Sequence, residues 1–344
     1  MKKFVLLFGT FLALSCSTHK NVALKKAETK VINLTKYLNL ISKESLKTNL
    51  TYIASDEMQG RNTGELGQKK AGNYIIKQHK ANGLSFPKKA TDFFQKVPSE
   101  YMKKGFSPKL NDSENIWIYI EGIEKPDEVV VVSAHYDHVG MKNGEIYNGA
   151  DDDGSGTVAL IEIAKAFQKA KTDGFGPKRS ILILHVTGEE HGLHGSRYYS
   201  ENPLFPLSKT VADVNIDMIG RRDEFHKESN NYVYLIGSDY LSTDLYTICE
   251  NVNKKYVNLT LDYKYNDLND ENRFYYRSDH YNFAKNGIPS VFLFNGTHAD
   301  YHQPTDDVDK IEFDALAKRT KLAFAIAWEI ANRKDRLVVD KDGK

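Results

Sequence analysis

The chain has 344 residues, of which 40% are hydrophobic and 27% are charged, so it is long enough to bury a large hydrophobic core. Its 47 basic and 46 acidic side chains almost cancel, and this balance argues against the strongly basic face that a nucleic-acid-binding protein requires. We therefore expect no nucleic-acid partner. Only two cysteines are present, Cys16 and Cys249, so the chain has no internal disulfide framework.

The N-terminus has the pattern of an export signal. Two lysines precede an apolar stretch, residues 4–14, that is too short for a permanent transmembrane helix. This stretch ends in LALSC, which resembles the lipobox of bacterial lipoproteins, where the cysteine, here Cys16, is lipidated. We therefore expect a signal peptide at 1–15, a polar tether at 16–30 and an exported lipoprotein that the lipid on Cys16 anchors to the cell envelope. A simple secretory peptide is the alternative.

The rest of the chain has the pattern of one domain, residues 31–335, followed by a C-terminal tail at 336–344. Apolar residues recur with helical spacing in residues 31–54 and 69–84, and a loop-like segment separates the two. Seven strand candidates follow, at residues 115–120, 128–134, 180–186, 212–217, 231–236, 258–263 and 289–294. Helix-period stretches lie near residues 155–171, 239–255 and 312–333. Apolar strands that alternate with helices predict a mostly parallel sheet covered on both faces.

Four of these strands run out into histidines or carboxylates. The residues concerned are His135 and Asp137, Glu189 and Glu190, Asp217, and, after the last strand, His298 and His302. Polar residues at one strand end would be an ordinary solvated terminus, but four such ends are a pattern. Because ligands of parallel sheets bind at the carboxyl ends of the strands, we expect these side chains to meet at one edge of the sheet.

The residue types at this edge indicate metal-assisted hydrolysis. Imidazoles and carboxylates without thiolates suit Zn²⁺ in a hydrolytic site. Asp151, Asp152 and Asp153 add three adjacent like charges, which raise one another's pKa unless cations neutralise them. Two divalent ions ~3.5–4 Å apart would resolve this cost, because one carboxylate can bridge both. We expect one aspartate to be the bridge, its neighbour to be structural support, and the third to meet solvent or to cap the following helix, where Asp153 or Ser155 is well placed.

Taken together, the motifs resemble a known family. SAHYDHVG, NGADDDGSG, TGEEHGLHGS, NIDMIGR, RSDHYNF and DYHQPTDDVDKI occur in the order found in the M28 zinc peptidases, which include bacterial leucyl-type aminopeptidases. The resemblance covers most of residues 50–330. It implies a three-layer αβα sandwich with a mixed, mostly parallel central sheet.

The resemblance also implies two zinc ions and a role for each motif residue. The implied metal ligands are His135 and Asp217 on one ion, Glu190 and His302 on the other, and Asp151 as the bridge between them. The implied catalytic residues are Glu189 as general base, Asp137 as the residue that orients His135, and Tyr275 as oxyanion partner, with the adjacent Tyr276 as the alternative.

An aminopeptidase acting on peptides with a free N-terminus is the leading hypothesis, because an excess of acid near the metals suits an α-ammonium group. Arg221 and Arg222 keep a carboxypeptidase or dipeptidase as the near alternative, since arginine can bind a terminal carboxylate through two hydrogen bonds. Glutaminyl cyclase, which resembles this fold but typically works with one zinc, is a further alternative. A non-catalytic surface binding module would have lost a ligand or the base, and none is missing.

Overall fold

The computed structural model describes Met1 and residues 32–343 except 104–109 and 268. Apart from Met1, the expected signal peptide, Cys16 and the tether therefore lie outside the described residues. Among the helices of the described part of the chain, none combines the length and the apolar character that crossing a bilayer requires.

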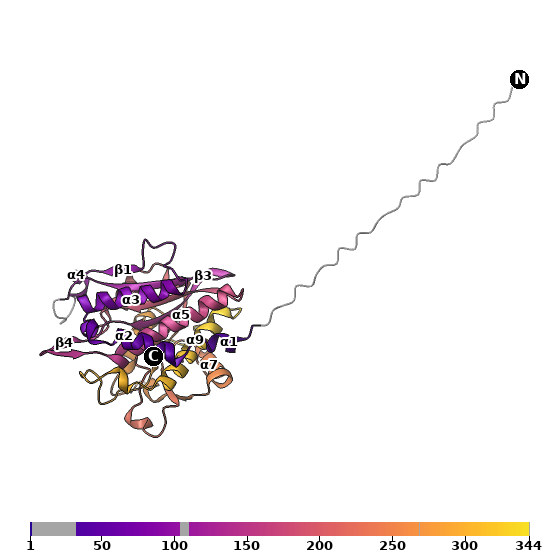
Figure 1. The fold of residues 1–344 in the computed structure, drawn as a ribbon. Helices are drawn as coiled ribbons and strands as arrows, with labels where there is room; N and C mark the ends of the chain where they lie inside the picture. The colour runs from indigo at the N-terminus through magenta and orange to yellow at the C-terminus, as the bar shows by residue number, and fades with distance from the viewer. Residues whose placement is uncertain (2–31, 104–109, 268, 344) are drawn as a thin grey trace. The chain divides into compact units, whose positions relative to one another are not determined.

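A mixed eight-stranded sheet forms the middle layer of the fold (Figure 1). In spatial order its strands are β1 (Phe94–Val97), β2 (Ser113–Ile120), β6 (Arg179–Val186), β3 (Lys125–His135), β7 (Thr210–Ile216), β10 (Ser290–Phe294), β8 (Tyr232–Ile236) and β9 (Thr260–Asp262). The neighbours β6, β3, β7 and β10 run parallel, and β9 is parallel to β8. The pairs β1–β2, β2–β6 and β8–β10 are antiparallel. A separate hairpin contains β4 (Gly140–Lys142) and β5 (Glu145–Tyr147).

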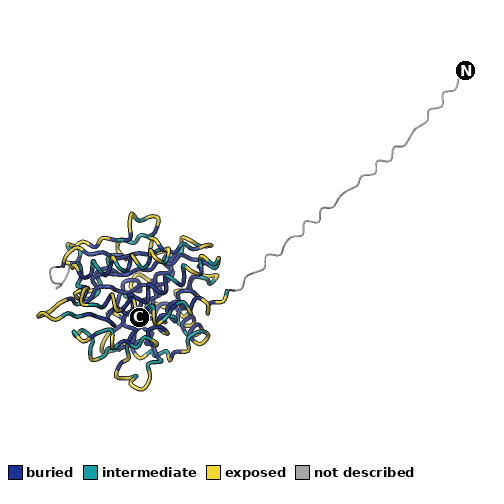
Figure 2. Tube along the Cα trace, in the orientation of Figure 1, coloured by how far each residue is buried: buried dark blue, intermediate teal, exposed yellow. Residues whose placement is uncertain are grey.

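The centre of the sheet is apolar because helices cover both of its faces. The four consecutive valines of β3, Val129 to Val132, are fully buried, and Figure 2 shows the interior of the fold as buried. Val129 and Val131 pack with Tyr199 and Phe283 from helices on one face. Because side chains alternate along a strand, Val130 and Val132 face the helices on the other side.

In the described part of the chain, six helices form one outer layer and three lie on the other face. The first layer has α5 (Gly156–Thr172) and α9 (Phe313–Asn332) against the sheet, with α1 (Leu34–Leu38), α2 (Lys43–Ile53), α3 (Leu66–Ala81) and α7 (Thr243–Val252) packed on them or on the sheet beside them. The opposite face carries α6 (His194–Glu201), α8 (His280–Ala284) and the short α4 (Ser99–Met102). This three-layer αβα arrangement confirms the expected fold class.

The structure differs from the sequence-based expectations mainly in short elements. The helical region expected at 31–54 is two helices, because α1 ends at Leu38 and Ser42 caps the start of α2 by accepting a hydrogen bond from the Ser45 main-chain nitrogen at 3.2 Å. The loop expected after α2 contains a short 3₁₀ helix, η1 (Asp56–Arg61). Strands β1, β4 and β5 have only three or four residues each, too few to show an alternating pattern.

Four parallel strands end at the same edge of the sheet and carry the residues of interest. β3 ends at His135, and β7 ends one residue before Asp217. β6 ends three residues before Glu189, and the loop after β10 contains His302. Since β6, β3, β7 and β10 are neighbours in this order, these side chains converge on a short stretch of that edge.

Candidate metal centre

The histidines and carboxylates form one cluster with two halves. Nε2 of His135 lies 3.2 Å from Oδ1 of Asp152 and 3.5 Å from Oδ1 of Asp217. Nε2 of His302 lies 3.0 Å from Oδ2 of Asp152 and 3.0 Å from Oε2 of Glu190. The two carboxylate oxygens of Asp152 therefore face different histidines, and this residue belongs to both halves.

The structure corrects the expectation that Asp151 is the shared residue. Its Oδ1 accepts a hydrogen bond from the Gly220 main-chain nitrogen at 2.6 Å. Its Oδ2 accepts from the Asn295 side chain at 3.0 Å and lies 3.1 Å from Nε2 of His298. The partners of both Asp151 oxygens are thus Gly220, Asn295 and His298, whereas those of Asp152 are His135 and His302. Three adjacent aspartates give no sequence signal of which one faces the edge.

Asp153 stabilises the start of α5. Its Oδ1 accepts hydrogen bonds from the main-chain nitrogens of Gly156 at 2.8 Å and Met218 at 3.1 Å. Ser155, the other candidate cap, makes no capping hydrogen bond with its side chain. Oδ2 of Asp153 has no hydrogen-bond partner, and Asp153 groups with His135 and Asp217 as residues that could hold one ion. Burial raises the pKa of Asp153 well above its usual value.

Asp137 contacts both His135 and the loop that carries Glu189. Its main-chain carbonyl lies 3.1 Å from Nδ1 of His135, closer than its carboxylate at 3.8 Å. The carboxylate instead accepts hydrogen bonds from Thr63 Oγ1 at 2.7 Å and from the Glu189 main-chain nitrogen at 3.3 Å. The imidazole of His135 is therefore oriented by a main-chain group, with Nε2 toward Asp152, and the carboxylate of Asp137 holds the loop that carries Glu189.

Carboxylates raise the pKa of His135 and of His302 in the cluster. Burial lowers the pKa of His302, but its hydrogen bonds with Asp152 and Glu190 raise the value to about 10. Burial also disfavours protonated His135, and the charges of Asp217 and Glu189 outweigh it, so this pKa is well above the usual one. The imidazolium charges partly neutralise the acids. A divalent cation would displace these protons, because only neutral imidazole binds a metal.

The unpaired atoms of the cluster fit metal ligands. Several buried atoms of the cluster make no hydrogen bond of good geometry: Nε2 of His135, Oε1 of Glu190 and both ring nitrogens of His138. All but Nε2 of His138 nevertheless lie close to a charged partner within the cluster. Nδ1 of His138 lies 2.6 Å from Oε1 of Glu190, and His138, Asp152 and Glu190 form a second group that could hold an ion. Buried polar atoms are normally paired, so unpaired ones that converge indicate a ligand. Nitrogen and carboxylate donors without thiolate suit Zn²⁺.

A small cavity of about 30 Å³ opens beside the cluster. Asp152, Glu189 and Asp217 form its acidic wall. The remaining wall is formed by Met218, Phe274, Arg277, Phe292, Phe294, Thr297 and Tyr301. Burial, reinforced by the charges of Asp217 and Glu190, raises the pKa of Glu189 well above its usual value. The cavity thus brings an acidic group of raised pKa next to an apolar surface.

Tyr275, expected as oxyanion partner, does not line this cavity. It is 7% exposed and packs in an aromatic cluster, with its ring centroid 4.3 Å from that of Tyr240. Tyr276 does not line the cavity either. Tyr301 does, and its ring stacks on that of His302 with 4.0 Å between centroids. Nη2 of Arg277 donates a hydrogen bond to the Tyr301 hydroxyl at 3.3 Å. Of Tyr275, Tyr276 and Tyr301, Tyr301 is therefore the one that lines the cavity.

Arg221 and Arg222 are bound to carboxylates of the protein. Nη2 of Arg221 lies 2.8 Å from Asp300, and Nε of Arg222 lies 3.0 Å from Glu312. Neither lines the cavity beside the cluster, whereas Arg277 does. The two arginines that kept a carboxypeptidase or dipeptidase as the near alternative therefore lie outside this cavity and bind carboxylates of the protein.

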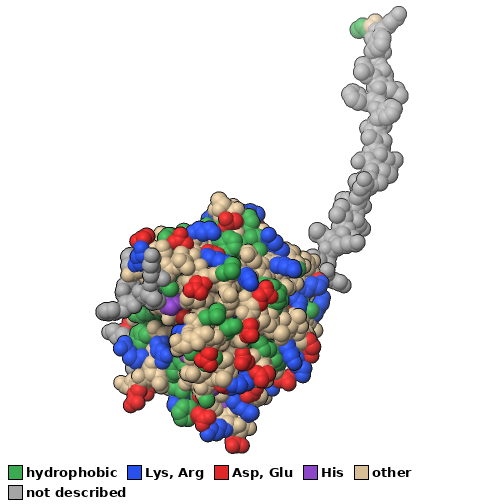
Figure 3. All heavy atoms as spheres, turned by 60° about the vertical axis from the view of Figure 1, so that its left-hand side comes forward, with side chains coloured by type: hydrophobic (Ala, Val, Ile, Leu, Met, Phe, Trp, Pro, Cys, Tyr) green, Lys and Arg blue, Asp and Glu red, His purple; other side chains and the backbone are tan. Residues whose placement is uncertain are grey.

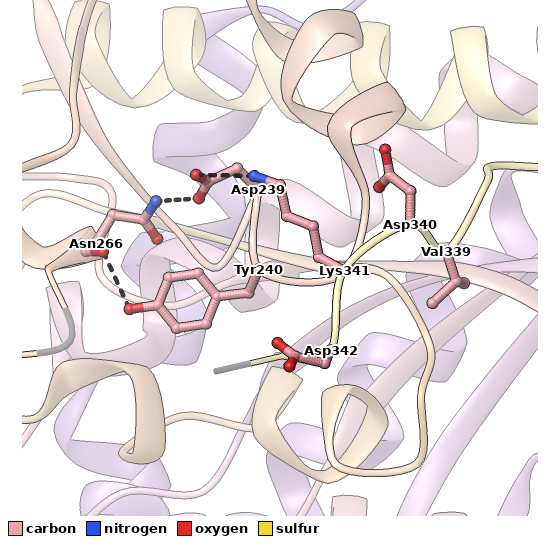
Figure 4. Close-up of a pocket in the computed structure, with 7 residues that line it drawn as sticks. All are labelled: Asp239, Tyr240, Asn266, Val339, Asp340, Lys341 and Asp342. Atoms are coloured by element: carbon pink, nitrogen blue, oxygen red, sulfur yellow. Dashed lines mark hydrogen bonds and ion pairs between the residues drawn. The ribbon is translucent and has the colours of Figure 1, made fainter.

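A larger, open cavity of about 720 Å³ lies at the C-terminal tail (Figure 4). Its lining residues are Asp239, Tyr240, Asn266, Val339, Asp340, Lys341 and Asp342, none of which belongs to the metal cluster. Figure 4 shows the Asp239 carboxylate between Asn266 and Lys341, so its charge is compensated within the protein. Acidic and basic side chains also intermingle on the face drawn in Figure 3. The convergent unpaired ligand atoms make the small cavity the candidate site.

Sequence reasoning missed several residues that the structure brings to the cluster. Tyr301 directly precedes His302, so its position next to an expected ligand was an available signal. Thr63 and the buried Arg61 come from the segment before the sheet, a loop by composition that also lies within the part of the chain that resembles the family. No sequence pattern predicts that this segment lies behind the cluster.

Comparison with known proteins identifies the same family that the sequence motifs resemble. The sequence model of peptidase family M28 matches residues 115–327, more than half of the chain. Leucine aminopeptidase 1 of Penicillium rubens is 28% identical over 216 residues, which cover 60% of this chain and 53% of that protein. The chain therefore spans about half the length of this curated relative.

Solved structures share the fold. The LapA aminopeptidase of Legionella pneumophila has a TM-score of 0.67 at 23% identity, over 97% of this chain and 81% of that one. BSAP, a zinc aminopeptidase of Bacillus subtilis, has a TM-score of 0.64 at 16% identity, over 88% of this chain and 99% of that one. A glutaminyl cyclase of Porphyromonas gingivalis has a TM-score of 0.65 at 19% identity, over 83% and 98%. At these identities the likeness shows the fold alone.

Proposed function

Because the chain belongs to peptidase family M28, we propose that it is a zinc aminopeptidase that hydrolyses the first peptide bond of substrates with a free N-terminus. The observation that carries the proposal is the position of Asp152. Its two oxygens lie 3.2 Å and 3.0 Å from Nε2 of His135 and of His302. A carboxylate shared in this way is what two adjacent divalent ions require.

In the proposed site, His135 and Asp217 would hold one ion, Glu190 and His302 would hold the other, and Asp152 would bind both. Bound zinc ions supply a Lewis acid for the substrate carbonyl and lower the pKa of water to near neutrality. His138 lies 2.6 Å from Glu190, and the Asp137 carbonyl lies 3.1 Å from His135, so each orients a ligand from outside.

Glu189 is the proposed general base. It lines the cavity, its Oε2 lies 4.0 Å from Nε2 of His135, and no ligand role is left for it once Glu190 is assigned. It would take a proton from the attacking water and give it to the leaving amine. Burial and the neighbouring carboxylates raise its pKa above the usual value in the absence of metal. A bound cation would lower that pKa again, which keeps the base ionised before attack.

The walls of the cavity support a substrate that begins with an ammonium group. The acidic wall of Glu189, Asp152 and Asp217 complements a positive charge. The aromatic wall, with Phe274 and Phe294, would contact the first side chain. The Tyr301 hydroxyl, which Arg277 holds, would donate a hydrogen bond to the oxyanion.

One substrate panel tests this function against its alternatives. Matched fluorogenic peptides with free and acetylated N-termini are assayed with protein that has been stripped of metal and with protein restored with zinc. We expect zinc-dependent release of the first residue from free-amine substrates only. Equal cleavage of acetylated substrates contradicts the proposal.

The same panel separates the related activities. A requirement for a free C-terminal carboxylate would identify a carboxypeptidase or dipeptidase, with Arg277 as the cation that lines the cavity. Cyclisation of N-terminal glutamine with loss of ammonia would identify a glutaminyl cyclase. Zinc binding without turnover on any substrate would identify a binding module.

We also propose that the protein is exported and anchored to the cell envelope through a lipid on Cys16, as the LALSC sequence suggests. Cys16→Ser should move the protein from the membrane fraction to the soluble fraction without changing the zinc-dependent activity. Retention of this variant in the membrane fraction would contradict the anchor.

A further inference from the structure

Arg61 is a fully buried cation behind the metal cluster. It is 0% exposed and ends η1, outside the residues 115–327 that match the family model. Taking a charged side chain out of water is costly unless its partners compensate. Its partners therefore indicate what Arg61 does.

The guanidinium group of Arg61 binds main-chain carbonyl oxygens from three segments. Nη1 donates to Asn148 at 2.6 Å and to Ile53 at 3.0 Å. Nη2 donates to Gly149 at 2.9 Å, and Nε donates to Tyr136 at 3.0 Å. Four of its five N–H groups are thus used, and no carboxylate among the described residues forms an ion pair with it.

These carbonyls lie next to metal-cluster residues in the chain. Tyr136 follows His135, and Asn148 and Gly149 precede the turn that carries Asp152. The main-chain oxygen of Arg61 also accepts a hydrogen bond from the His138 nitrogen at 3.2 Å. Arg61 therefore connects the end of β3 to the loop that carries the shared carboxylate.

A carboxylate holds the same loop from its amide side. Oδ2 of Asp306 accepts hydrogen bonds from the main-chain nitrogens of Asp151 at 3.0 Å and Asp152 at 3.1 Å. The main-chain oxygen of Asp306 accepts a further one from Ala150 at 2.9 Å. Carbonyls of residues 148–149 thus bind a cation, and amides of residues 151–152 bind an anion. Both groups are buried, so water competes little for these hydrogen bonds.

The backbone that carries Arg61 adopts a rare conformation. Gln59, Gly60 and Arg61 have φ values of 50°, 65° and 52°, in the left-handed region that non-glycine residues seldom occupy. A Cβ atom at Gly60 would lie 2.4 Å from the Gly140 carbonyl oxygen of β4. Such conformations persist where the surroundings require them, and they concentrate at functional sites.

Long-range charges also favour a cation here. Burial lowers the pKa of Arg61, while the charges of Asp152, Asp306 and Asp137 raise it. The positive charge therefore compensates acids of the cluster without occupying a position between them.

We propose that Arg61 is a positioning residue that holds loop 148–152, and with it the Asp152 carboxylate, in the orientation that binds two divalent ions. This inference rests on the metal site of the proposed function and adds a residue that touches neither metal nor substrate. It predicts that the loop is held before any ion binds.

Arg61→Lys tests the proposal because it keeps the positive charge and removes the planar guanidinium group that donates to the four carbonyls. A lysine ammonium has three donors on one atom and does not reach four carbonyls in different directions. We expect the affinity for zinc, measured by competition with a chromophoric chelator, to fall about 10–100-fold, as it does when supports of metal ligands are lost. The visible absorption spectrum of bound cobalt should change as well.

Arg179→Lys is the matched control. Arg179 is also 0% exposed, and its Nη1 donates to the carbonyls of Ile330 and Arg333. It is the first residue of β6, at the end of the strand opposite to the metal cluster. Its replacement should lower the melting temperature and leave zinc affinity and the cobalt spectrum unchanged.

Two results would overturn the proposal: wild-type zinc affinity in Arg61→Lys, or an equal loss of affinity in Arg179→Lys at a similar melting temperature. Should Arg61→Lys not fold, hydrogen exchange of the metal-stripped wild-type protein is the second test. We expect the amides of 150–152 to exchange as slowly as those of β6. Exchange as fast as in the β4–β5 hairpin would show that the loop is not held, and would equally overturn it.

These measurements distinguish the inference from the proposed function. Zinc affinity, the cobalt spectrum and hydrogen exchange do not depend on peptide cleavage. Two bound ions with no turnover would contradict the peptidase and leave the role of Arg61 standing.

Discussion

Buried histidines in two regions of this protein have pKa values shifted in opposite directions. His79 of α3 and His185 of β6 are both 0% exposed, with their Nε2 atoms 3.0 Å apart. Burial lowers the pKa of His79 to about 3 and that of His185 well below its usual value. His135 is 1% exposed, yet carboxylates raise its pKa well above the usual value.

The comparison between this core pair, His79 and His185, and the metal centre shows what burial alone does. Burial favours neutral imidazole in both places, and only neighbouring carboxylates reverse the effect. His185 lies in β6 and Glu189 follows only four residues later. A single strand and the loop after it thus contribute to a neutral packing contact and to a charged site.

Replacing the shared carboxylate should have the largest effect on the metal centre. Asp152→Asn removes the charge that both histidines face, so we expect fewer than two zinc ions per chain and no measurable hydrolysis. Elemental analysis and the free-amine peptide assay measure these outcomes.

Asp151→Asn is the neighbouring control for Asp152→Asn. Asp151 faces Gly220 and Asn295, so this variant should keep two ions even if it is less stable. Loss of metal from Asp151→Asn with retention in Asp152→Asn would restore the original assignment of the bridge.

Replacing the proposed base should separate chemistry from metal binding. Glu189→Gln should lower kcat by about 10²–10⁴-fold, the usual contribution of a general base. Zinc content should stay at that of the wild type, because Glu189 is not a proposed ligand. Unchanged turnover would remove Glu189 from its role.

The two tyrosines allow a similar comparison between the centre and the packed core. Tyr301→Phe should lower kcat by roughly 10²–10³-fold, as loss of one oxyanion donor does elsewhere. Tyr275→Phe should leave kcat unchanged, because Tyr275 packs against Tyr240 outside the cavity. A large loss of kcat in Tyr275→Phe with none in Tyr301→Phe would support Tyr275 as the oxyanion partner that the resemblance implies.

Zinc affinity should increase with pH because the histidines of the centre must lose protons. Since the pKa of His302 is about 10, its imidazole is protonated at pH 6–8 without a metal. Each displaced proton makes affinity about tenfold weaker for every pH unit lost. Calorimetric titrations at pH 6, 7 and 8 measure this slope, and a pH-independent affinity would contradict the raised pKa.

The core pair should have a pH effect of the same sign, seen in the stability of the fold and not in metal binding. Between pH 6.5 and about 3 the unfolded chain binds a proton at His79 that the folded chain does not, so the free energy of unfolding falls as pH falls. The slope is about 1.4 kcal/mol per pH unit for each such histidine. Urea unfolding between pH 4 and 7 should show a shallower decline for the double variant His79→Leu/His185→Leu. An identical decline would show that the pair does not contribute.

Most of the framework could be predicted from the sequence. The apolar run Val129–Val132 and the helical spacing of residues 155–171 predicted a covered sheet. The spacing of apolar residues along the chain reflects which faces of a strand or helix are buried. The chain positions of His135, Asp217 and His302 at strand ends predicted their convergence, since neighbouring parallel strands end at one edge.

The sequence-based choices that differ from the structure are choices between residues of the same type. Asp151 and Asp152 have the same side chain, and so do Tyr275 and Tyr301. Which of two adjacent residues faces a site depends on local backbone angles, such as those of the turn 150–155, where Asp152 has φ −99° and ψ 103°. Contacts across the fold set these angles, and residue type alone does not report them.

By itself, the sequence determined the family, the layered fold and the ligand types, because these follow from burial patterns and from the chemistry of side chains along the chain. Only the tertiary structure selected Asp152 over Asp151, placed Tyr301 at the cavity and put Arg61 behind the loop. The physical reason is that these assignments depend on direction and distance between segments far apart in the chain. Arg61 and Gly149 are 88 residues apart, and no local pattern encodes their hydrogen bond.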